Sequence, residues 1–273
     1  MRIMSLIDDV CDNKDLKSEH GLSLYFEDNG KKYLVDTGQS GKFIINAKRL
    51  GIDISDIDAV FISHNHYDHT DGLKEFFKVN DKAKVYMKSD AKYDYYAKPF
   101  VKVSMKFGIY RNNANRFLLI DEAYQIGRIS LLSDTVADAS FFCQDTRLLM
   151  KKGTKFYPDD FSHELFIAIK DKDKVHVISS CSHRGIVNIL KSAKKRFGLE
   201  IGTVYAGLHM SANGGKKMNC SAAYFEKVCR ELDIVGFEKL YTCHCTGLFA
   251  FEKLQKRLGE KVLYAKTGDE VIL

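Results

Sequence analysis

Apolar and polar residues alternate with the two-residue period of β-strands in the early part of the chain. Residues 22–27 and 32–36 show this alternation or run apolar, and Asn29-Gly30 lies between them. An Asn-Gly pair between two such segments favours the tight turn of a β-hairpin. Residues 42–50 have helical spacing and end at Gly51, a typical helix stop. The short apolar run at 59–62 predicts a buried strand.

The later part of the chain alternates between helical and strand-like segments. Residues 165–169 and 175–180 predict a second hairpin, joined by a charged turn. Further helices are predicted at 72–79, 186–197, 222–232 and 248–258, and further strands at 84–87, 117–121, 129–133, 203–206, 239–242 and 271–273. Residues 93–112 show no clear pattern. This mixture favours an α+β fold of two packed sheets with helices outside.

The composition is that of an ordinary globular protein with a real core. Hydrophobic residues make up 45% and charged residues 29% of the 273 residues. Only two prolines occur and no stretch resembles a linker, so we expect a single domain over residues 1–273. The net charge of +6 comes from lysines spread along the chain. A nucleic-acid partner is therefore not expected, since such a surface would need clustered basic residues interleaved with aromatic ones.

The cysteines and the N-terminal residues bear on location. Seven cysteines are scattered along the chain, which in the absence of an export signal indicates reduced thiols. The first twelve residues contain Arg2 and three aspartates, so they lack the apolar region of a signal peptide. No run of about 18 apolar residues occurs, so we expect no membrane span. These features predict a cytoplasmic protein.

Four side chains able to bind metal occur within six residues, directly after the predicted strand at 59–62. They are His64, His66, Asp68 and His69, within residues 63–69, which we call the histidine loop. Imidazole and carboxylate are the usual ligands of zinc and similar divalent ions. The chain has nine histidines in total, so a third of them within six residues is improbable by chance. We expect His64 and His66 to face one ion and Asp68 and His69 to face a second.

The pattern His-x-His-x-Asp-His after an apolar strand resembles the signature of the metallo-β-lactamase superfamily. The likeness extends to six further segments, namely EHGLSL at 19–24, DTGQS at 36–40, NA at 46–47 with LGID at 50–53, CSHRGIVN at 181–188, GLH at 207–209 and HCTG at 244–247. Together they resemble the branch of the dihydropterin-ribofuranosyl-aminobenzene-phosphate synthases. The resemblance implies a four-layer αββα sandwich with the metals at one edge of the two sheets. Residues 85–155 lie outside it.

The same resemblance implies the remaining ligands. His183 would complete the shell of the first ion and His244 that of the second. His209 would be either another ligand or, as we prefer, a catalytic group that touches the substrate. Asp36 follows the predicted strand at 32–35 and is the candidate carboxylate for accepting a hydrogen bond from a metal-bound imidazole, the alternative being a turn cap before Gly38. Arg184 would either clamp an anionic substrate or point to solvent.

The sequence departs from the family pattern at several positions. Many superfamily members carry a bridging aspartate after a strand in the second half, but here the strand at 175–180 leads into Cys181. This difference puts ordinary β-lactam and thioester hydrolysis in doubt. Cys181 is either a thiolate ligand or, as we prefer, a buried neutral cysteine. The cysteines on either side of His244 do not have zinc-finger spacing, so no structural zinc is expected there. Asn65 and Asp71 stand where the branch usually has glycines, and we expect them to reshape the loop without removing a ligand.

These features predict a dinuclear metal-dependent hydrolase. Two neighbouring divalent ions would lower the pKa of a shared water to give hydroxide near neutral pH and would stabilise charge on the attacked oxygen. Only Asp68 and the hydroxide would offset the charge of the ions, which favours a small anionic substrate, most simply a phosphoester and by resemblance a pterin-related one. Zinc suits the ligands best, with manganese or iron as alternatives. The rival functions are a redox di-iron protein, which would favour an acid in place of His66, and a metal-binding module without catalysis.

Overall fold

The chain forms two compact units from interleaved segments. The computed structural model describes residues 1–273 except 107, 134–135, 137 and 213–214. The first unit comprises residues 1–121, 146–163 and 265–273, and the second comprises 122–145 and 164–264. Each unit has its own cluster of buried apolar side chains. That the two units form a single domain stays a prediction.

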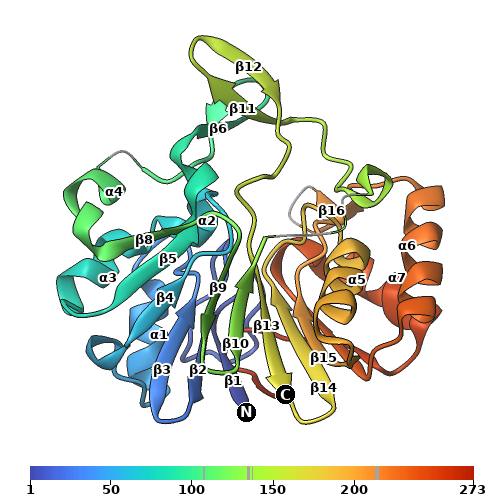
Figure 1. Ribbon diagram of the computed structural model, residues 1–273, viewed down its shortest axis with the longest axis horizontal. Coiled ribbons are helices and arrows are strands. Elements are labelled where there is room, and N and C mark those ends of the chain that lie inside the picture. The colour runs from blue at the N-terminus through green and yellow to red at the C-terminus, as the bar shows by residue number, and fades with distance from the viewer. Residues whose placement is uncertain (107, 134–135, 137, 213–214) are drawn as a thin grey trace. The chain divides into compact units, whose positions relative to one another are not determined.

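The first unit is built on a seven-stranded sheet in the order β20-β1-β2-β3-β4-β5-β8 (Figure 1). Its strands are β1 (Arg2–Ile7), β2 (Ser23–Asp28), β3 (Lys31–Val35), β4 (Ala59–Phe61), β5 (Lys84–Lys88), β8 (Phe117–Ile120) and β20 (Glu270–Ile272). The β2–β3 hairpin confirms the turn predicted at Asn29-Gly30. Strands β3, β4 and β5 run parallel with Val35 paired to Phe61 and Phe61 to Tyr86. The loops that follow these three strands therefore leave from one edge of the sheet.

Short helices and a small second sheet complete the first unit. The helices are α1 (Lys42–Arg49), α2 (Tyr67–Thr70), α3 (Leu73–Val79) and α4 (Ile109–Asn112), with 3-10 turns η1 (Ile54–Asp56), η2 (Ser89–Lys92) and η3 (Ala114–Arg116). Phe43 of α1 and Phe76 of α3 are fully buried in the apolar core with Val60 and Val85 of the sheet. Burying such side chains stabilises each by about 1.5–3 kcal/mol relative to exposure.

Residues 93–112, which show no clear pattern in the sequence, contribute two strands to the small sheet. Its order is β12-β11-β6-β7, with β6 (Asp94–Ala97), β7 (Val101–Lys102), β11 (Leu148–Lys152) and β12 (Lys155–Pro158). All four residues of β12 and both residues of β7 are exposed. Strands with no buried face lack the apolar alternation from which a strand is predicted.

The second unit carries a seven-stranded sheet in the order β19-β18-β15-β14-β13-β10-β9. Its strands are β9 (Ala123–Ile126), β10 (Ile129–Leu132), β13 (Phe166–Asp171), β14 (Lys174–Ser179), β15 (Glu200–Ala206), β18 (Lys239–Thr242) and β19 (Val262–Tyr264). The β13–β14 hairpin is antiparallel, as predicted. Strands β14, β15 and β18 are parallel, and Ser179 pairs with Ala206, which pairs with Thr242. Their carboxyl ends are therefore level at one edge.

Three helices pack against this sheet. They are α5 (Ile186–Phe197), α6 (Ala222–Val235) and α7 (Gly247–Leu258). The unit also contains a short strand pair, β16 (Ser211–Ala212) with β17 (Lys217–Met218), and the 3-10 turns η4 (Ala139–Phe141) and η5 (His244–Thr246). Figure 1 shows α5 beside β14 and β15. Helix α6 packs against α5, and α7 packs against α6 and β19. All three helices confirm the predicted segments. In the described parts of the chain, no helix is both long and apolar enough to cross a membrane.

Candidate metal centre

The histidine loop begins where β4 ends and runs into the short helix α2. Because Val35 pairs with Phe61, the residue after β3 lies level with the start of the loop. Asp36 therefore reaches it, and the backbone N–H of Asp36 donates to the carbonyl of Phe61 at 2.9 Å. The structure thus gathers Asp36 with all four predicted loop residues in the first unit.

Three imidazoles of the loop lie against one another in the protein interior. The ring centroids of His64 and His66 are 4.6 Å apart and those of His64 and His69 are 4.2 Å apart. The exposed fractions of these three residues are 1%, 6% and 0%. Asp68 is also buried, with its Oδ2 3.5 Å from Nε2 of His69. Buried imidazoles this close cannot all be positively charged, so neutral rings are favoured, and neutral rings suit a shared divalent cation.

The carboxylate of Asp36 organises this cluster. Its Oδ1 accepts from the backbone N–H of Ser63 at 2.8 Å, and its Oδ2 accepts from the Ser63 hydroxyl at 2.7 Å and from Nδ1 of His69 at 2.8 Å. The Ser63 oxygen also lies 2.8 Å from Nδ1 of His64. Since the hydroxyl gives its only proton to the carboxylate, His64 must donate from Nδ1. Both rings therefore direct Nε2, the other nitrogen, toward the cluster.

Burial and neighbouring carboxylates have opposite effects on these rings. Burial lowers the pKa of the His66 imidazole, which keeps that ring neutral at pH 7. Burial also lowers the pKa of His69, but Asp68 and Asp36 outweigh it and raise the pKa of His69 to about 9. An ion bound at Nε2 of His69 would displace that proton, as metal binding to histidine generally does.

Two residues that the sequence did not single out support the loop from a distant segment. His163 is fully buried, and its Nδ1 accepts from the backbone N–H of Asn65 at 3.0 Å. Its Nε2 lies 3.3 Å from Oδ2 of Asp159, which is also 3.8 Å from Nε2 of His66. Burial raises the pKa of the Asp159 carboxyl, but His163 and His66 lower it well below its usual range. No local pattern marks this pair, because its partners lie almost a hundred residues away.

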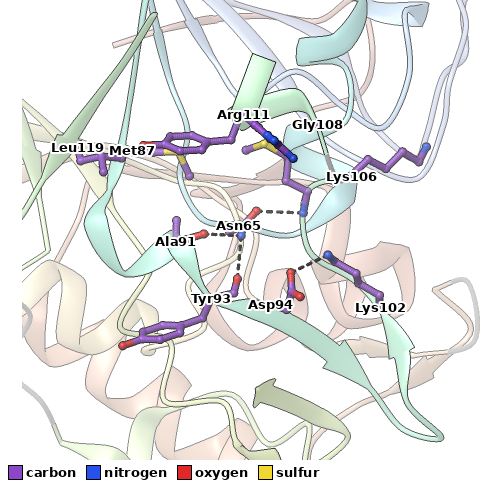
Figure 2. Close-up of a pocket in the computed structure, with 12 residues that line it drawn as sticks. Asn65, Met87, Ala91, Tyr93, Asp94, Lys102, Lys106, Gly108, Arg111 and Leu119 are labelled. Atoms are coloured by element: carbon purple, nitrogen blue, oxygen red, sulfur yellow. Dashed lines mark hydrogen bonds and ion pairs between the residues drawn. The ribbon is translucent and has the colours of Figure 1, made fainter. Parts of the chain in front are cut away.

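Asn65 fastens the back of the loop to the neighbouring segments. Its side-chain amide donates to the carbonyls of Ala91 at 2.7 Å and Tyr93 at 3.3 Å, and its oxygen accepts from the N–H of Met105 at 3.0 Å. Figure 2 shows these bonds at the wall of a pocket of about 210 Å³, which is also lined by Lys102 and other residues. A glycine here would supply none of these bonds. Asn65 therefore connects the histidine loop to residues 91–105, which follow β5 and lie outside the family resemblance.

Gly21 allows the backbone before β2 to lie close to the histidine loop. It has φ +144°, and a Cβ there would lie 2.4 Å from the carbonyl oxygen of Asp68. The adjacent His20 contacts the Asp68 carboxylate, with its Nε2 3.4 Å from Oδ2, while its Nδ1 lies 2.8 Å from Asp9. The preceding Glu19 accepts hydrogen bonds from the backbone N–H groups of Gln39 and Ser40, both at 3.1 Å. The segment before β2 thus braces the loop and the turn after β3.

In the second unit, His183 lies in the turn after β14 and is fully buried. The carboxylate of Glu164 accepts from the backbone N–H groups of His183 at 2.7 Å and Arg184 at 2.9 Å. The carbonyl of His183 accepts from the N–H of Cys143 at 2.8 Å. Gly185 follows with φ +88°, and a Cβ there would lie 2.2 Å from the carbonyl oxygen of Phe141. The backbone around His183 is therefore held from both sides.

His209 and His244 follow the next two parallel strands. Both have the left-handed backbone conformation, with φ of +44° and +43°, which is uncommon outside glycine and often found at functional sites. The ring centroids of His209 and His183 are 4.4 Å apart. Burial lowers the pKa of His209, but Asp145 and Cys245 raise it to about 9. The structure thus brings His209 to His183, and the level strand ends place His244 at the same edge.

The guanidinium of Arg184 stacks on an aromatic ring of the second unit. Its Cζ lies 5.0 Å from the centroid of Phe142, which is within cation–π range. The side chain is half-buried. The choice between an anion clamp and a solvent-facing arginine stays a prediction.

Comparisons with known proteins give the family. The model of the family described as the metallo-beta-lactamase superfamily matches residues 18–164. An uncharacterized protein of Methanocaldococcus jannaschii, MJ0448, is 29% identical over 93% of this chain and 94% of its own length. A second protein of that organism, 7,8-dihydropterin-6-methyl-4-(beta-D-ribofuranosyl)-aminobenzene-5'-phosphate synthase, is 27% identical over 92% of this chain and 89% of its own length.

A solved structure has the same fold. The crystal structure of Tm1679, described as a metal-dependent hydrolase of the beta-lactamase superfamily, matches with a TM-score of 0.84 at 29% identity. The match covers 100% of this chain and 99% of that one. The α+β class predicted from the sequence is therefore confirmed, and each unit supplies a sheet with helices, as an αββα sandwich requires. The chain belongs to the metallo-beta-lactamase superfamily and has its metal-dependent hydrolase fold.

Proposed function

We propose that this protein hydrolyses a small anionic molecule, a phosphoester, with the help of two divalent ions. The observation that supports this most strongly is the buried cluster of His64, His66 and His69 beside Asp68, with ring centroids 4.2 and 4.6 Å apart. Divalent ions supply two things in such a site, an acidified water and stabilisation of charge on oxygen. Zinc is the ion that fits an imidazole and carboxylate donor set best.

The donor set fits a metal because its orientation is fixed in advance. Nδ1 of His69 bonds to Asp36, and Nδ1 of His64 bonds to Asp36 through Ser63. Metal-bound imidazoles usually donate their second N–H to a carboxylate or carbonyl in this way. In the proposal, Asp36 holds the two rings, the Nε2 atoms bind ions, and Asp68 both binds an ion and orients the attacking water.

The proposal also includes four residues that follow strands β14, β15 and β18. We assign His183 to the first ion and His244 to the second, as the family resemblance implies. His209 is assigned to the substrate, together with Arg184, whose guanidinium rests on Phe142. Glu164 keeps the backbone of His183 and Arg184 in place through its two hydrogen bonds.

The charge of the loop supports an anionic substrate. Among the four proposed loop ligands only Asp68 is a carboxylate, so neutral imidazoles leave most of the charge of two divalent ions uncompensated. A phosphoester brings negative charge to the position where it would be stabilised. The relative named as a dihydropterin-linked phosphate synthase supports a pterin-related substrate within that class. Reduced thiols and a cytoplasmic location belong to the same proposal.

A substrate panel tests the proposed function. The zinc-loaded protein should hydrolyse a nitrophenyl phosphodiester or phosphomonoester faster than a neutral β-lactam or a lactone with a similar leaving group. The rate should rise with pH through roughly 6–8, the range in which divalent ions acidify water. If the neutral substrates are hydrolysed faster across that range, the charge argument fails and the phosphoester assignment is withdrawn.

A further inference from the structure

Three donor atoms suited to a metal converge inside the second unit. The sulfurs of Cys181 and Cys245 and a ring nitrogen of His244 all lie within 4.8 Å of one another. The exposed fractions of these residues are 3%, 8% and 2%. Cys181 follows β14, whereas His244 and Cys245 follow β18. The level ends of the parallel strands therefore assemble a group that no sequence spacing would indicate.

The sulfur of Cys245 lies in a polar environment. It accepts a hydrogen bond from the backbone N–H of His209 at 3.2 Å and lies 3.9 Å from the carbonyl oxygens of Ser180 and Cys181. Gly207 provides the space, since a Cβ there would lie 2.8 Å from this sulfur and 2.2 Å from the Ser180 oxygen. Any other residue would push the thiol out of this place.

A cysteine of the apolar core provides the contrast. Cys229 on α6 is fully buried, and it belongs to the cluster of aliphatic and aromatic side chains under the helices. Burial raises the pKa of its thiol to about 12, as is usual for an inert structural cysteine. Cys181 and Cys245 differ from it because each lies beside a second sulfur and an imidazole. The sequence preference for a neutral core cysteine therefore suits Cys229 better than Cys181.

We propose that Cys181, His244 and Cys245 bind one divalent ion through two thiolates and one imidazole. This inference rests on the proposed function, because it extends the ligand set of the ion assigned to His244. Zinc–sulfur bonds of about 2.3 Å and zinc–nitrogen bonds of about 2.0–2.1 Å place tetrahedral ligand atoms roughly 3.5–3.8 Å apart. The present separations of up to 4.8 Å require only a modest inward movement.

The thiolates change what this ion can be and do. Soft sulfur ligands select zinc or iron over manganese and magnesium, so the manganese alternative is disfavoured at this position. Two thiolates also offset the charge of the ion they bind. The attraction for an anionic substrate would then come mainly from the imidazole-rich histidine loop, and the two ions would be chemically unequal.

Zinc X-ray absorption of the full-length protein tests this inference. The protein is loaded with zinc under reducing conditions, and its metal content is measured in parallel. The wild type should show a sulfur shell at about 2.3 Å beside a nitrogen and oxygen shell near 2.0–2.1 Å. The double variant Cys181→Ser/Cys245→Ser should lose the sulfur shell. The matched control Cys243→Ser replaces a buried cysteine next to His244 that lies outside the cluster, and it should retain that shell.

The outcomes separate this inference from the proposed function. Zinc bound with only nitrogen and oxygen neighbours in the wild type overturns the thiolate site and leaves the hydrolase proposal standing. A sulfur shell that persists in the double variant also overturns it. A wild type that retains no zinc overturns both. If the double variant does not fold, the cobalt-substituted wild type decides, since it must show a sulfur-to-cobalt charge-transfer band in the near ultraviolet.

Discussion

The histidine loop and the strand-end histidines of the second unit bring similar side chains together in different ways. The loop residues His64, His66 and His69 are close in the chain. Asp36 orients the ring of His69 directly and the ring of His64 through the Ser63 hydroxyl. His183 and His209 come from the ends of separate parallel strands, with ring centroids 4.4 Å apart. Local sequence determines the first group, whereas sheet topology determines the second.

The same topological rule nevertheless operates in both units. Asp36 reaches the loop because β3 and β4 are parallel and level, just as the ends of β14, β15 and β18 are level. Functional residues of sheets with parallel strands commonly gather at the carboxyl ends of the strands. The two groups differ in what is held in place by hydrogen bonds. In the loop, the Asp36 carboxylate orients side chains. In the second unit, the Glu164 carboxylate holds the backbone N–H groups of His183 and Arg184.

The largest effect is expected for Asp68→Asn. In the proposal Asp68 binds an ion and orients the attacking water, so kcat should fall about 10²–10⁴-fold while KM changes little. Steady-state kinetics on a nitrophenyl phosphodiester would measure this. Asp71→Asn is a matched control, because Asp71 is a buried carboxylate of the same segment that bonds to Lys106. A rise in KM with kcat unchanged would show that Asp68 acts only in binding.

Asp36→Asn tests whether preorganisation by a carboxylate matters. In the wild type, both carboxylate oxygens of Asp36 accept hydrogen bonds from Ser63 or His69. An asparagine has only one side-chain oxygen, and its NH₂ group would face another donor. His69 and His64 would therefore lose their orientation. We expect the affinity for zinc to fall about 10–100-fold, measured by competition with a chelator. Asp28→Asn, at the other end of the β2–β3 hairpin, should leave the affinity unchanged. Equal affinities for all three proteins would contradict the role of Asp36.

His244→Ala and His209→Ala should separate ligand from substrate contact within the second unit. The first variant should lose one of two ions in elemental analysis, since it removes a proposed ligand. The second should retain both ions and lose activity instead. If the metal contents are reversed, His209 is the ligand and His244 is not.

Asn65→Ala is expected to affect stability more than chemistry. It leaves the N–H of Met105 and the carbonyls of Ala91 and Tyr93 without their side-chain partner, which should cost about 1–3 kcal/mol of unfolding free energy. Urea denaturation would measure this, with exposed Asn115→Ala as the control. An unchanged denaturation midpoint would show that these bonds add nothing to the fold.

Much of the fold could be predicted from the sequence where local patterns are strong. The β2–β3 turn at Asn29-Gly30 and helix α5 are two examples, because turn chemistry and helical spacing are local. Strand β12 could not be predicted, since none of its residues is buried. Strand β1 was also missed, although its pattern of buried residues is strong.

The site divides in the same way between local and distant information. The proposed loop ligands could be selected from six consecutive residues. His163 and Glu164 were not identified, because their roles depend on partners that are far apart in the chain. The N–H of Asn65 lies 98 positions from His163, and the N–H of His183 lies 19 positions from Glu164. The nearness of Cys181 to Cys245, 64 residues apart, likewise required the strand order.

Elemental analysis of the purified chain tests the central claim most directly. Wild-type protein should retain close to two divalent ions per chain after dialysis against metal-free buffer. The double variant His64→Ala/His66→Ala should lose them together if it stays folded by circular dichroism, because the loop would no longer hold the first ion or the geometry for the second. Full occupancy in that folded double variant, or no metal in the wild type, would contradict the account.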